Sequence, residues 1–279
     1  MSWMVRAGLA VFLAAVPAAA EGLVYTQVSR RTHTDALGRE HTETLRQTIY
    51  AAPVGLRSET EGSSIVTIMR LDEGLIYQLD LSRQLYAEVP LAEVKRRMER
   101  YKALLRAHFR RMPEEKKRRL APVLGLGRAR VRVIRSSVEV VISGVPCRKY
   151  SFYENGCLRL ELWLTERYRP PADYSVFMEA TGEFSPRLIA LRRRYQGFAM
   201  KKRIHPVLQA NPAVENTVLG VERRPLPEDL FRVPEGFRKV PSVLPEGAPG
   251  AKKDGKTAPP VPVAPSPVPD EPADAPLPD

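Results

Sequence analysis

The sequence has few of the residues from which catalytic and metal sites are usually built. Its 279 residues include only four histidines and two cysteines. The histidines lack the spacing with cysteine or carboxylates that metal ligands show, and they stand at His33, His41, His108 and His205. No G-x-S-x-G nucleophile elbow occurs. Gly125 and Gly127 lack the third glycine and the following helix of a phosphate-binding loop. These absences predict a protein that is not an enzyme and that carries no cofactor and no metal.

Long apolar runs are missing after the first twenty residues, so no later segment is expected to span a membrane. The N-terminal run combines a basic Arg6, an apolar stretch from Ala7 to Val16, Pro17 and three small residues ending at Ala20. This pattern is typical of a signal peptide, and the stretch is shorter than the roughly 20 residues of a transmembrane helix. We therefore expect cleavage near Ala20 and a periplasmic or secreted protein. An uncleaved membrane anchor is the alternative.

Negative charge is in deficit, because 44 Lys and Arg stand against 32 Asp and Glu, a net charge of +12. Such a balance favours nucleic acid, membrane surfaces or acidic partners. Export makes nucleic acid an improbable partner. Anionic lipid head groups or an acidic protein are the better candidates.

β-forming residues separated by turn signals dominate residues 21–240. Runs at 23–31, 42–51, 65–70, 75–81 and 85–89 predict an antiparallel meander. Further strands are expected at 129–135, 138–143, 188–195, 198–205 and 214–223. The clearest hairpin joins 145–153 to 157–165 through Asn155-Gly156, a strong two-residue turn. The fold class predicted for residues 21–240 is therefore mainly β, with some helix (α+β).

The two cysteines lie on the two arms of this hairpin, in a compartment where disulfides persist. A tight turn pairs Glu154 with Cys157 and places Cys147 opposite Leu164, which separates the two sulfurs. A Cys147–Cys157 disulfide therefore needs a wider loop or a bulge. Two buried small side chains without a bond between them are the other alternative.

Residues 91–124 form a helical insert in this prediction. Apolar residues recur every three or four positions at Leu91, Val94, Met98, Tyr101, Leu105, Phe109 and Met112. Twelve Lys or Arg and three acidic residues lie between Lys95 and Arg119. The basic face could meet an anionic membrane. We favour the simpler interpretation that the apolar stripe covers the sheet and the charges are solvated. A second helix is expected at 171–180.

The tail, residues 241–279, holds 12 of the 26 prolines and no aromatic residue. This composition cannot build a core and predicts a disordered or polyproline II segment. An inert solvated linker is the favoured interpretation. The alternatives are that the acidic end of the tail folds onto the basic helices, or that the tail docks on a partner's aromatic groove.

Several segments together resemble the exported domain-of-unknown-function family 4412. They are IMRLDEGLIYQLDLSRQLYAEV with the basic helix after it, ISGVPCRKYSFYENGCLRLELWLT, and PLPEDLFRVPEGFRKV. That family is similar to the LolA-type periplasmic lipoprotein-carrier fold. The resemblance implies a curved antiparallel half-barrel sheet, covered by helices over an apolar cavity, that binds a lipid or a lipidated protein.

On this basis we expect a carrier or binding domain for a lipid, a lipoprotein or another apolar ligand. Met98, Leu105, Phe109 and Met112 are the candidate lining residues, although the same side chains could be ordinary core. A structural or interaction protein of the cell envelope, acting through its basic helix or its tail, is the second hypothesis.

Overall fold

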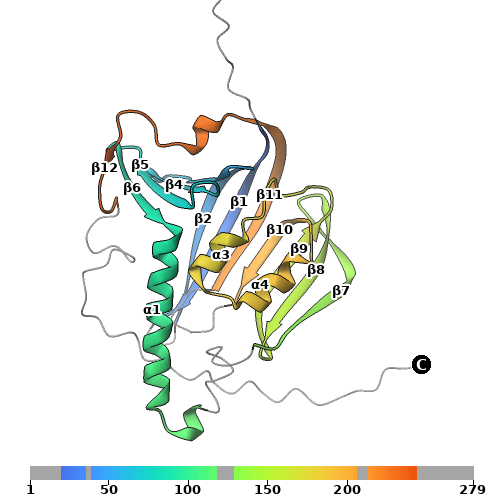
Figure 1. The fold of residues 1–279 in the computed structure, drawn as a ribbon. Helices are drawn as coiled ribbons and strands as arrows, with labels where there is room; N and C mark the ends of the chain where they lie inside the picture. Colours follow the sequence, from blue (N-terminus) through green and yellow to red (C-terminus); the bar gives the residue numbers. More distant parts are fainter. Residues whose placement is uncertain (1–19, 36–38, 118–128, 206–212, 244–279) are drawn as a thin grey trace, which may run out of the picture.

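The strands of the chain form one open, curved sheet in the part that the computed structural model describes, residues 20–35, 39–117, 129–205 and 213–243 (Figure 1). In chain order they are β1 (Ala20–Thr34), β2 (Glu40–Ala52), β3 (Gly55–Thr60), β4 (Ile65–Arg70), β5 (Leu75–Asp80), β6 (Leu85–Pro90), β7 (Val131–Ile142), β8 (Val145–Glu154), β9 (Cys157–Thr165), β10 (Phe198–Ile204), β11 (Ala213–Leu226) and β12 (Arg238–Lys239). The helices are α1 (Leu91–Arg110), α3 (Ser175–Thr181), α4 (Pro186–Arg193) and the 3-10 turn η1 (Glu228–Phe231). The mainly β class predicted from the sequence is confirmed.

Two meanders meet in the middle of the sheet, whose strand order is β12-β6-β5-β4-β3-β2-β1-β11-β10-β9-β8-β7. The long strands β1 and β11 pair antiparallel from Ala20 with Leu226 to Thr32 with Ala213. All neighbours are antiparallel except β12, which runs parallel to β6. The pairing of β11 with β1 joins the two meanders into one sheet. It also brings residues from distant parts of the sequence to one surface of that sheet.

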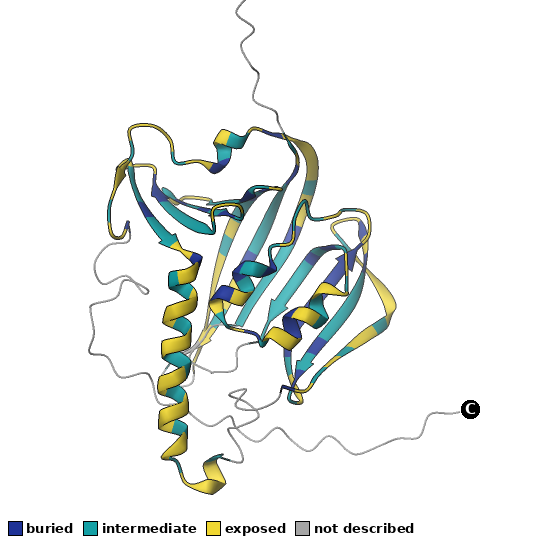
Figure 2. Cartoon of the chain, in the orientation of Figure 1, coloured by how far each residue is buried: buried dark blue, intermediate teal, exposed yellow. Residues whose placement is uncertain are grey.

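Different segments cover the two faces of the sheet. On one face, Leu188 and Ile189 of α4 are fully buried against Leu160 and Leu162 of β9. On the other face, the C-terminal segment packs Phe231 of η1 in one cluster with residues of β4 and β5, among them Ile68 and Leu79. Figure 2 shows the buried sides of α3 and α4 against the sheet, whereas most of α1 is exposed.

Helix α1 does not form the sheet cover that the sequence predicts. Leu91 is its only buried residue. Its main neighbours are α3 and β6, and it leaves the body of the protein at its C-terminal end (Figure 1). The helices next to the sheet are α3 and α4, so the predicted amphipathic cover is not confirmed for this insert.

Three other details of the sequence prediction differ from the structure. Residues 188–195, predicted as a strand, belong largely to α4, because Ser185 accepts a hydrogen bond from the Leu188 amide as N-cap and Pro186 begins the helix. Strand β3 was not predicted, since it carries a single large apolar side chain, Leu56. The two strands expected at 129–135 and 138–143 are one strand, β7, with an irregular register between Arg135 and Glu139.

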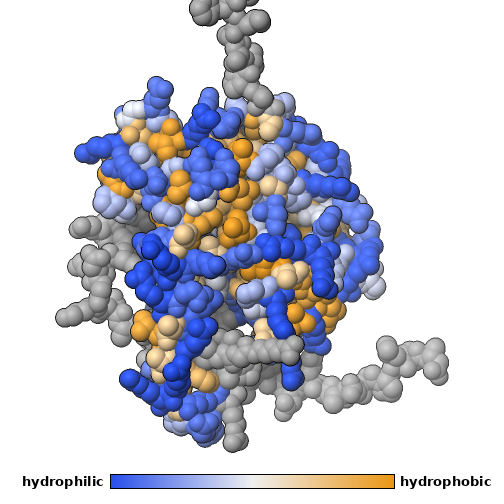
Figure 3. All heavy atoms as spheres, in the orientation of Figure 1, coloured by the Kyte–Doolittle hydropathy of each residue, from blue (hydrophilic) through white to orange (hydrophobic). Residues whose placement is uncertain are grey.

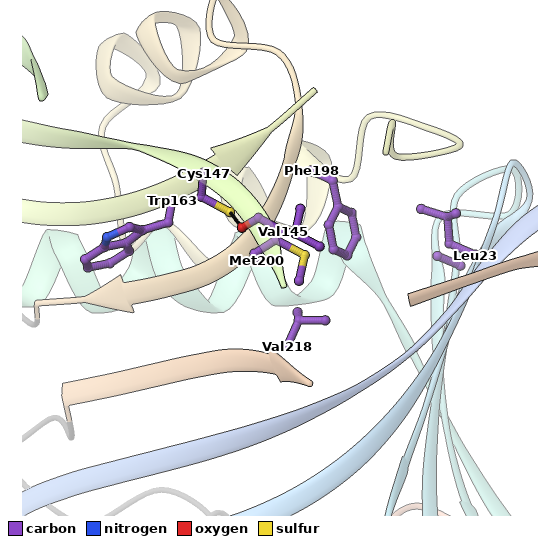
Figure 4. Packing of buried hydrophobic residues seen from close by; sticks show 8 residues of the cluster. Leu23, Val145, Cys147, Trp163, Phe198, Met200 and Val218 are labelled. Carbon is purple, nitrogen blue, oxygen red and sulfur yellow. Dashed lines mark hydrogen bonds between the residues drawn. The ribbon is translucent and has the colours of Figure 1, made fainter. Parts of the chain in front are cut away.

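The Cys147–Cys157 disulfide is absent, and both thiols are free. The hairpin register pairs Glu154 with Cys157, as expected, but a bulge places Arg148 rather than Cys147 opposite Leu164. At about 3.3 Å of rise per residue, the cysteines lie more than about 20 Å apart along the arm. Cys147 is buried beside Trp163 and Met200, where burial raises the pKa of its thiol to about 11 (Figure 4).

Some predictions fall outside the described residues: the signal peptide up to residue 19, the insert at 118–124 and the tail at 244–279. None of the helices in the described ranges is long and apolar enough to cross a membrane.

Candidate functional site: a cavity beneath α3 and α4

A cavity of about 360 Å³ lies between the sheet and the segment that contains α3 and α4. Its floor consists mainly of apolar side chains from β1, β3 and β9–β11, among them Tyr25, Leu56, Leu160, Leu162, Phe198 and Val218. Its roof comes from residues 170–184, with Pro171, Tyr174, Phe177, Met178 and Phe184, and from Arg192 of α4. Figure 3 shows hydrophobic residues gathered in the centre of this face, with hydrophilic residues along much of α1.

The floor follows from strand alternation. On β9, Leu160 and Leu162 face the cavity, and on β10 their cross-strand partners Ile204 and Lys202 do the same. A bulge near Met200 lets Phe198 also reach the cavity, where its ring meets the Tyr25 ring edge-on at a centroid distance of 5.1 Å. Long-range pairing of β1 with β11 therefore completes the floor.

The roof is held by hydrogen bonds at both ends. Before α3, the Tyr174 hydroxyl donates to the carbonyl oxygen of Ala52 at 2.8 Å, which ties the roof to β2. The Asp173 carboxylate accepts from the Ser175 hydroxyl at 2.8 Å and from the Arg193 guanidinium at 2.9 Å, which ties α3 to α4. Between the helices, Gly182 takes a left-handed conformation (φ 61°) that ends α3.

One end of the cavity carries charged and polar groups. Lys202, Arg192 and Glu183 all line it, and Asn216 lies directly opposite Lys202 on β11. The side chains of Lys202 and Arg192 make no hydrogen bond or close ion pair with any residue that the structure describes. The Oδ1 atom of Asn216 is buried without a hydrogen-bond partner among those residues. The cavity is thus an apolar chamber with unpaired polar groups at one end.

The low polarity of the chamber shows in the pKa values of these groups. Burial lowers the pKa of Lys202, with Glu183 opposing the shift and Arg192 adding to it. Burial also lowers the pKa of Arg192. The pKa of Glu183 is raised by burial, against the effect of Arg159 and Lys202. Each of these charges is therefore less stable here than in water.

Arg159 adds a further cation at the edge of this end. The cross-strand pairing of β9 skips this residue, because Phe152 pairs with Leu160 and Tyr153 with Leu158. The guanidinium of Arg159 donates to the Glu183 carbonyl oxygen at 2.8 Å and lies 5.7 Å from the centroid of the Phe184 ring. Strict alternation along β9 would place Arg159 on the face of Glu161 and Trp163, and the bulge instead turns it toward the roof.

The opposite face of the same strands has its charges paired. Glu161, whose side chain is 4% exposed, contacts Lys149 at 2.5 Å and His205 at 2.8 Å. Lys201 contacts Glu215 at 3.0 Å, and Arg203 also pairs with Glu215. Burial would raise the pKa of Glu161, but the hydrogen bonds from Lys149 and His205 outweigh it, so the pKa is lowered.

None of the lining residues predicted from the sequence lines this cavity. Met98, Leu105, Phe109 and Met112 are half-buried along one side of α1 and its C-terminal turn. Met98 lies against Gly182, at the end of α3. That these four side chains meet a ligand stays a prediction.

The residues that do form the polar end were missed, although the sequence holds a signal for them. Met200, Lys202 and Ile204 alternate on β10, so Lys202 occupies a position where the pattern favours an apolar residue. Asn216 stands likewise between Val214 and Val218 on β11.

Other groups of side chains in the described residues are weaker candidates for a functional site. His33 and His41 stack across the β1–β2 hairpin with ring centroids 5.4 Å apart, and His41 contacts Asp35 at 3.0 Å, all at the exposed tip. No three His, Cys, Asp or Glu side chains within the described ranges are grouped to hold a metal. A second hollow of about 500 Å³ on β1–β4 is lined largely by polar side chains such as Arg46 and Glu59.

Comparisons with known proteins add little. No family model matches the chain, and no curated protein matches its sequence. Among solved structures, an uncharacterised conserved protein from Thermus thermophilus is 11% identical over 80% of this chain and 90% of its own, with a TM-score of 0.40. A LolA superfamily protein from Nitrosomonas europaea is 8% identical over 76% and 90%, with a TM-score of 0.32. PNGF-II is 8% identical over 78% of this chain and 31% of its own, with a TM-score of 0.33. Likenesses at this level carry no argument about function.

Proposed function

We propose that this chain is an exported binding or carrier protein that holds an apolar ligand, such as the acyl chain of a lipid or lipoprotein, beneath α3 and α4. The observation that carries the proposal is the chamber of about 360 Å³ with its mainly apolar lining. Ligand sites in proteins usually measure about 300–1,000 Å³ and are mostly apolar with a few placed polar groups. The chamber has both properties.

The volume of the chamber suits a single acyl chain rather than a whole diacyl lipid. At about 30 Å³ for each water-sized group, about a dozen such groups fill it. An acyl chain of roughly ten carbons is on this scale. Decanol is therefore a suitable uncharged probe.

Filling the chamber with protein atoms tests the proposal. Ala199 lines the cavity and is partly buried. We expect Ala199→Phe to abolish decanol binding in isothermal titration calorimetry, because the ring occupies the space of the ligand. Ala107→Phe on an exposed part of α1 is the matched control and should bind as the unchanged protein does.

Two outcomes would contradict the proposal. One is that the unchanged protein binds no decanol. The other is that Ala199→Phe binds it as well as the Ala107→Phe control does, with both variants folded by circular dichroism.

A second candidate function, contact with an anionic membrane surface, is favoured by the exposed cations of α1. Arg96 and Arg100 have 71% and 73% of their side chains exposed, and both lie within ion-pair distance of Glu93. Exposed basic helices are attracted to anionic lipid. Sedimentation with phosphatidylglycerol vesicles tests it: a variant with Arg96, Arg100 and Arg106 changed to Gln should lose binding that the unchanged protein shows.

A further inference from the structure

We infer that the ligand of the chamber is an anionic single-chain amphiphile, whose acidic head group is held by Lys202 and Arg192 while its chain lies against the apolar floor. This inference rests on the proposed function, and it adds the head-group chemistry. Carboxylate and phosphate head groups share the chemistry, since both offer anionic oxygens to ammonium and guanidinium donors.

The first support is the location of the two cations. Lys202 extends from β10 and Arg192 from α4, so one cation belongs to the floor and the other to the roof. Both line the chamber that also contains Tyr25, Phe198 and Val218. A head group between them would bridge the sheet and the roof.

The second support is the lack of protein partners. Among the described residues, no carboxylate lies within ion-pair distance of the Lys202 ammonium or of the Arg192 guanidinium. Glu183 is the acidic residue whose charge raises the pKa of Lys202, and burial disfavours the charged form of Glu183 itself. A half-buried cation without a partner is costly, and an anionic ligand would remove that cost.

The third support is the unpaired oxygen of Asn216. Its Oδ1 atom is buried without a hydrogen-bond partner in the described part of the chain, directly across the strand pair from Lys202. Unsatisfied buried polar atoms are rare in native structures and call for a partner. The remaining hydroxyl of a phosphate monoester monoanion, or a water held by either head group, would supply the missing donor.

The neighbouring cations show that this arrangement is particular to the chamber. Lys201 and Arg203 flank Lys202 on the same strand but face the other side, where both pair with Glu215. Of these three consecutive basic residues, the one that faces the chamber is the one without a close carboxylate among the described residues.

Calorimetric titration with four probes that share a ten-carbon chain tests the inference on the full exported domain. The probes are decanoate, decyl phosphate, decanol and decyltrimethylammonium. We expect at least one of the two anions to bind about 10- to 100-fold more tightly than decanol, the range for hydrogen bonds to charged groups. The better anion then identifies the head group as carboxylate or phosphate. The cation should bind less tightly than decanol.

Two substitutions connect the preference to the residue. Lys202→Met should abolish the preference for the anion while keeping decanol binding, because it replaces the charge with an apolar side chain of similar length. Lys201→Met removes the same charge from the opposite face and should retain the preference. Arg192→Gln, with the exposed Arg194→Gln as its control, repeats the test from the roof if Lys202→Met fails to fold.

The outcomes separate the two proposals. If decanol binds but neither anion binds more tightly, or if Lys202→Met and Arg192→Gln both keep the preference, the inference about the head group is overturned and the proposed function stands. If no probe binds at all, the proposed function fails and the inference fails with it.

Discussion

Both faces of β9 and β10 carry basic side chains, but those on the outer face have acidic partners and the one on the chamber face has no close acidic partner among the described residues. On the outer face, Lys149 and Lys201 lie 5.1 and 5.2 Å from the centroid of the Trp163 ring and contact Glu161 and Glu215. On the chamber face, Lys202 has no such partner among the described residues. The outer charges are therefore compensated by ion pairs, whereas the charge of Lys202 carries a desolvation cost that no close carboxylate among the described residues offsets.

The largest effect is expected from Glu161→Gln on the outer face. The substitution removes a buried carboxylate on which Lys149 and His205 converge. Breaking a buried ion pair by removing one partner costs about 3 kcal/mol. We expect a loss of this size in the free energy of unfolding, measured by urea denaturation.

Glu166→Gln is the control for this prediction, because Glu166 is exposed at the end of the same strand. Its effect should stay within about 0.5 kcal/mol. Equal effects of Glu161→Gln and Glu166→Gln would show that the outer network does not stabilise the sheet.

Smaller changes in the free energy of unfolding, of opposite sign, are expected when Lys202 on the chamber face and Lys201 on the outer face are replaced. Without ligand, Lys202→Met should raise the free energy of unfolding by about 1 kcal/mol, because an apolar side chain replaces an unpaired half-buried charge. Lys201→Met should lower it by up to about 1 kcal/mol, since it removes an ion pair and a cation–ring contact. Thermal or urea unfolding of both variants at pH 7 measures the difference.

If Lys202→Met destabilised the protein as much as Lys201→Met, the two faces would not differ. The lack of a close carboxylate would then not make the charge of Lys202 destabilising.

The smallest effect is a pH dependence of the outer face. The folded-state pKa values of Glu161 and Glu215 are lowered, because hydrogen bonds from basic side chains outweigh burial. Groups with a lowered pKa contribute stability above their unfolded pKa, near 4.3, and lose it as the pH falls through the folded value. The stability gap between the unchanged protein and Glu161→Gln should therefore narrow, by about 1 kcal/mol or less, between pH 6 and pH 3.

The same measurement of stability against pH applies to Lys201→Met, the other variant of the outer face. The gap between Lys201→Met and the unchanged protein should narrow in that range as well, because Glu215 becomes protonated. A gap for Glu161→Gln that stays constant down to pH 3 would contradict the ionised state of Glu161 in the folded protein.

The sequence predicted the sheet better than the site. Strong local signals, such as the Asn155-Gly156 turn and the alternating leucines of β9, were sufficient for the hairpin of β8 and β9. Bulges carry no comparable signal, so strict alternation along β9 does not give the side to which Arg159 turns. The strand predicted at 188–195 failed because its apolar residues fit either structure, and the capping signal of Ser185-Pro186 decides for α4.

The chamber itself depends on long-range pairing. Tyr25 and Val218 lie almost 200 positions apart in the sequence and line the same floor only because β1 pairs with β11. The helix with the strongest apolar stripe, α1, attracted the prediction of the lining, whereas the shorter α3 and α4 form the roof. Local periodicity identifies an apolar face but not the surface on which it packs.

A crystal structure of the protein with bound decanoate tests the central claim most directly. We predict that the hydrocarbon chain of decanoate lies beneath α3 and α4 against Tyr25 and Phe198. One carboxylate oxygen of decanoate should lie within hydrogen-bond distance of the Lys202 ammonium. Decanoate bound elsewhere, for example along Met98 and Leu105 of α1 with the chamber empty, would contradict the account.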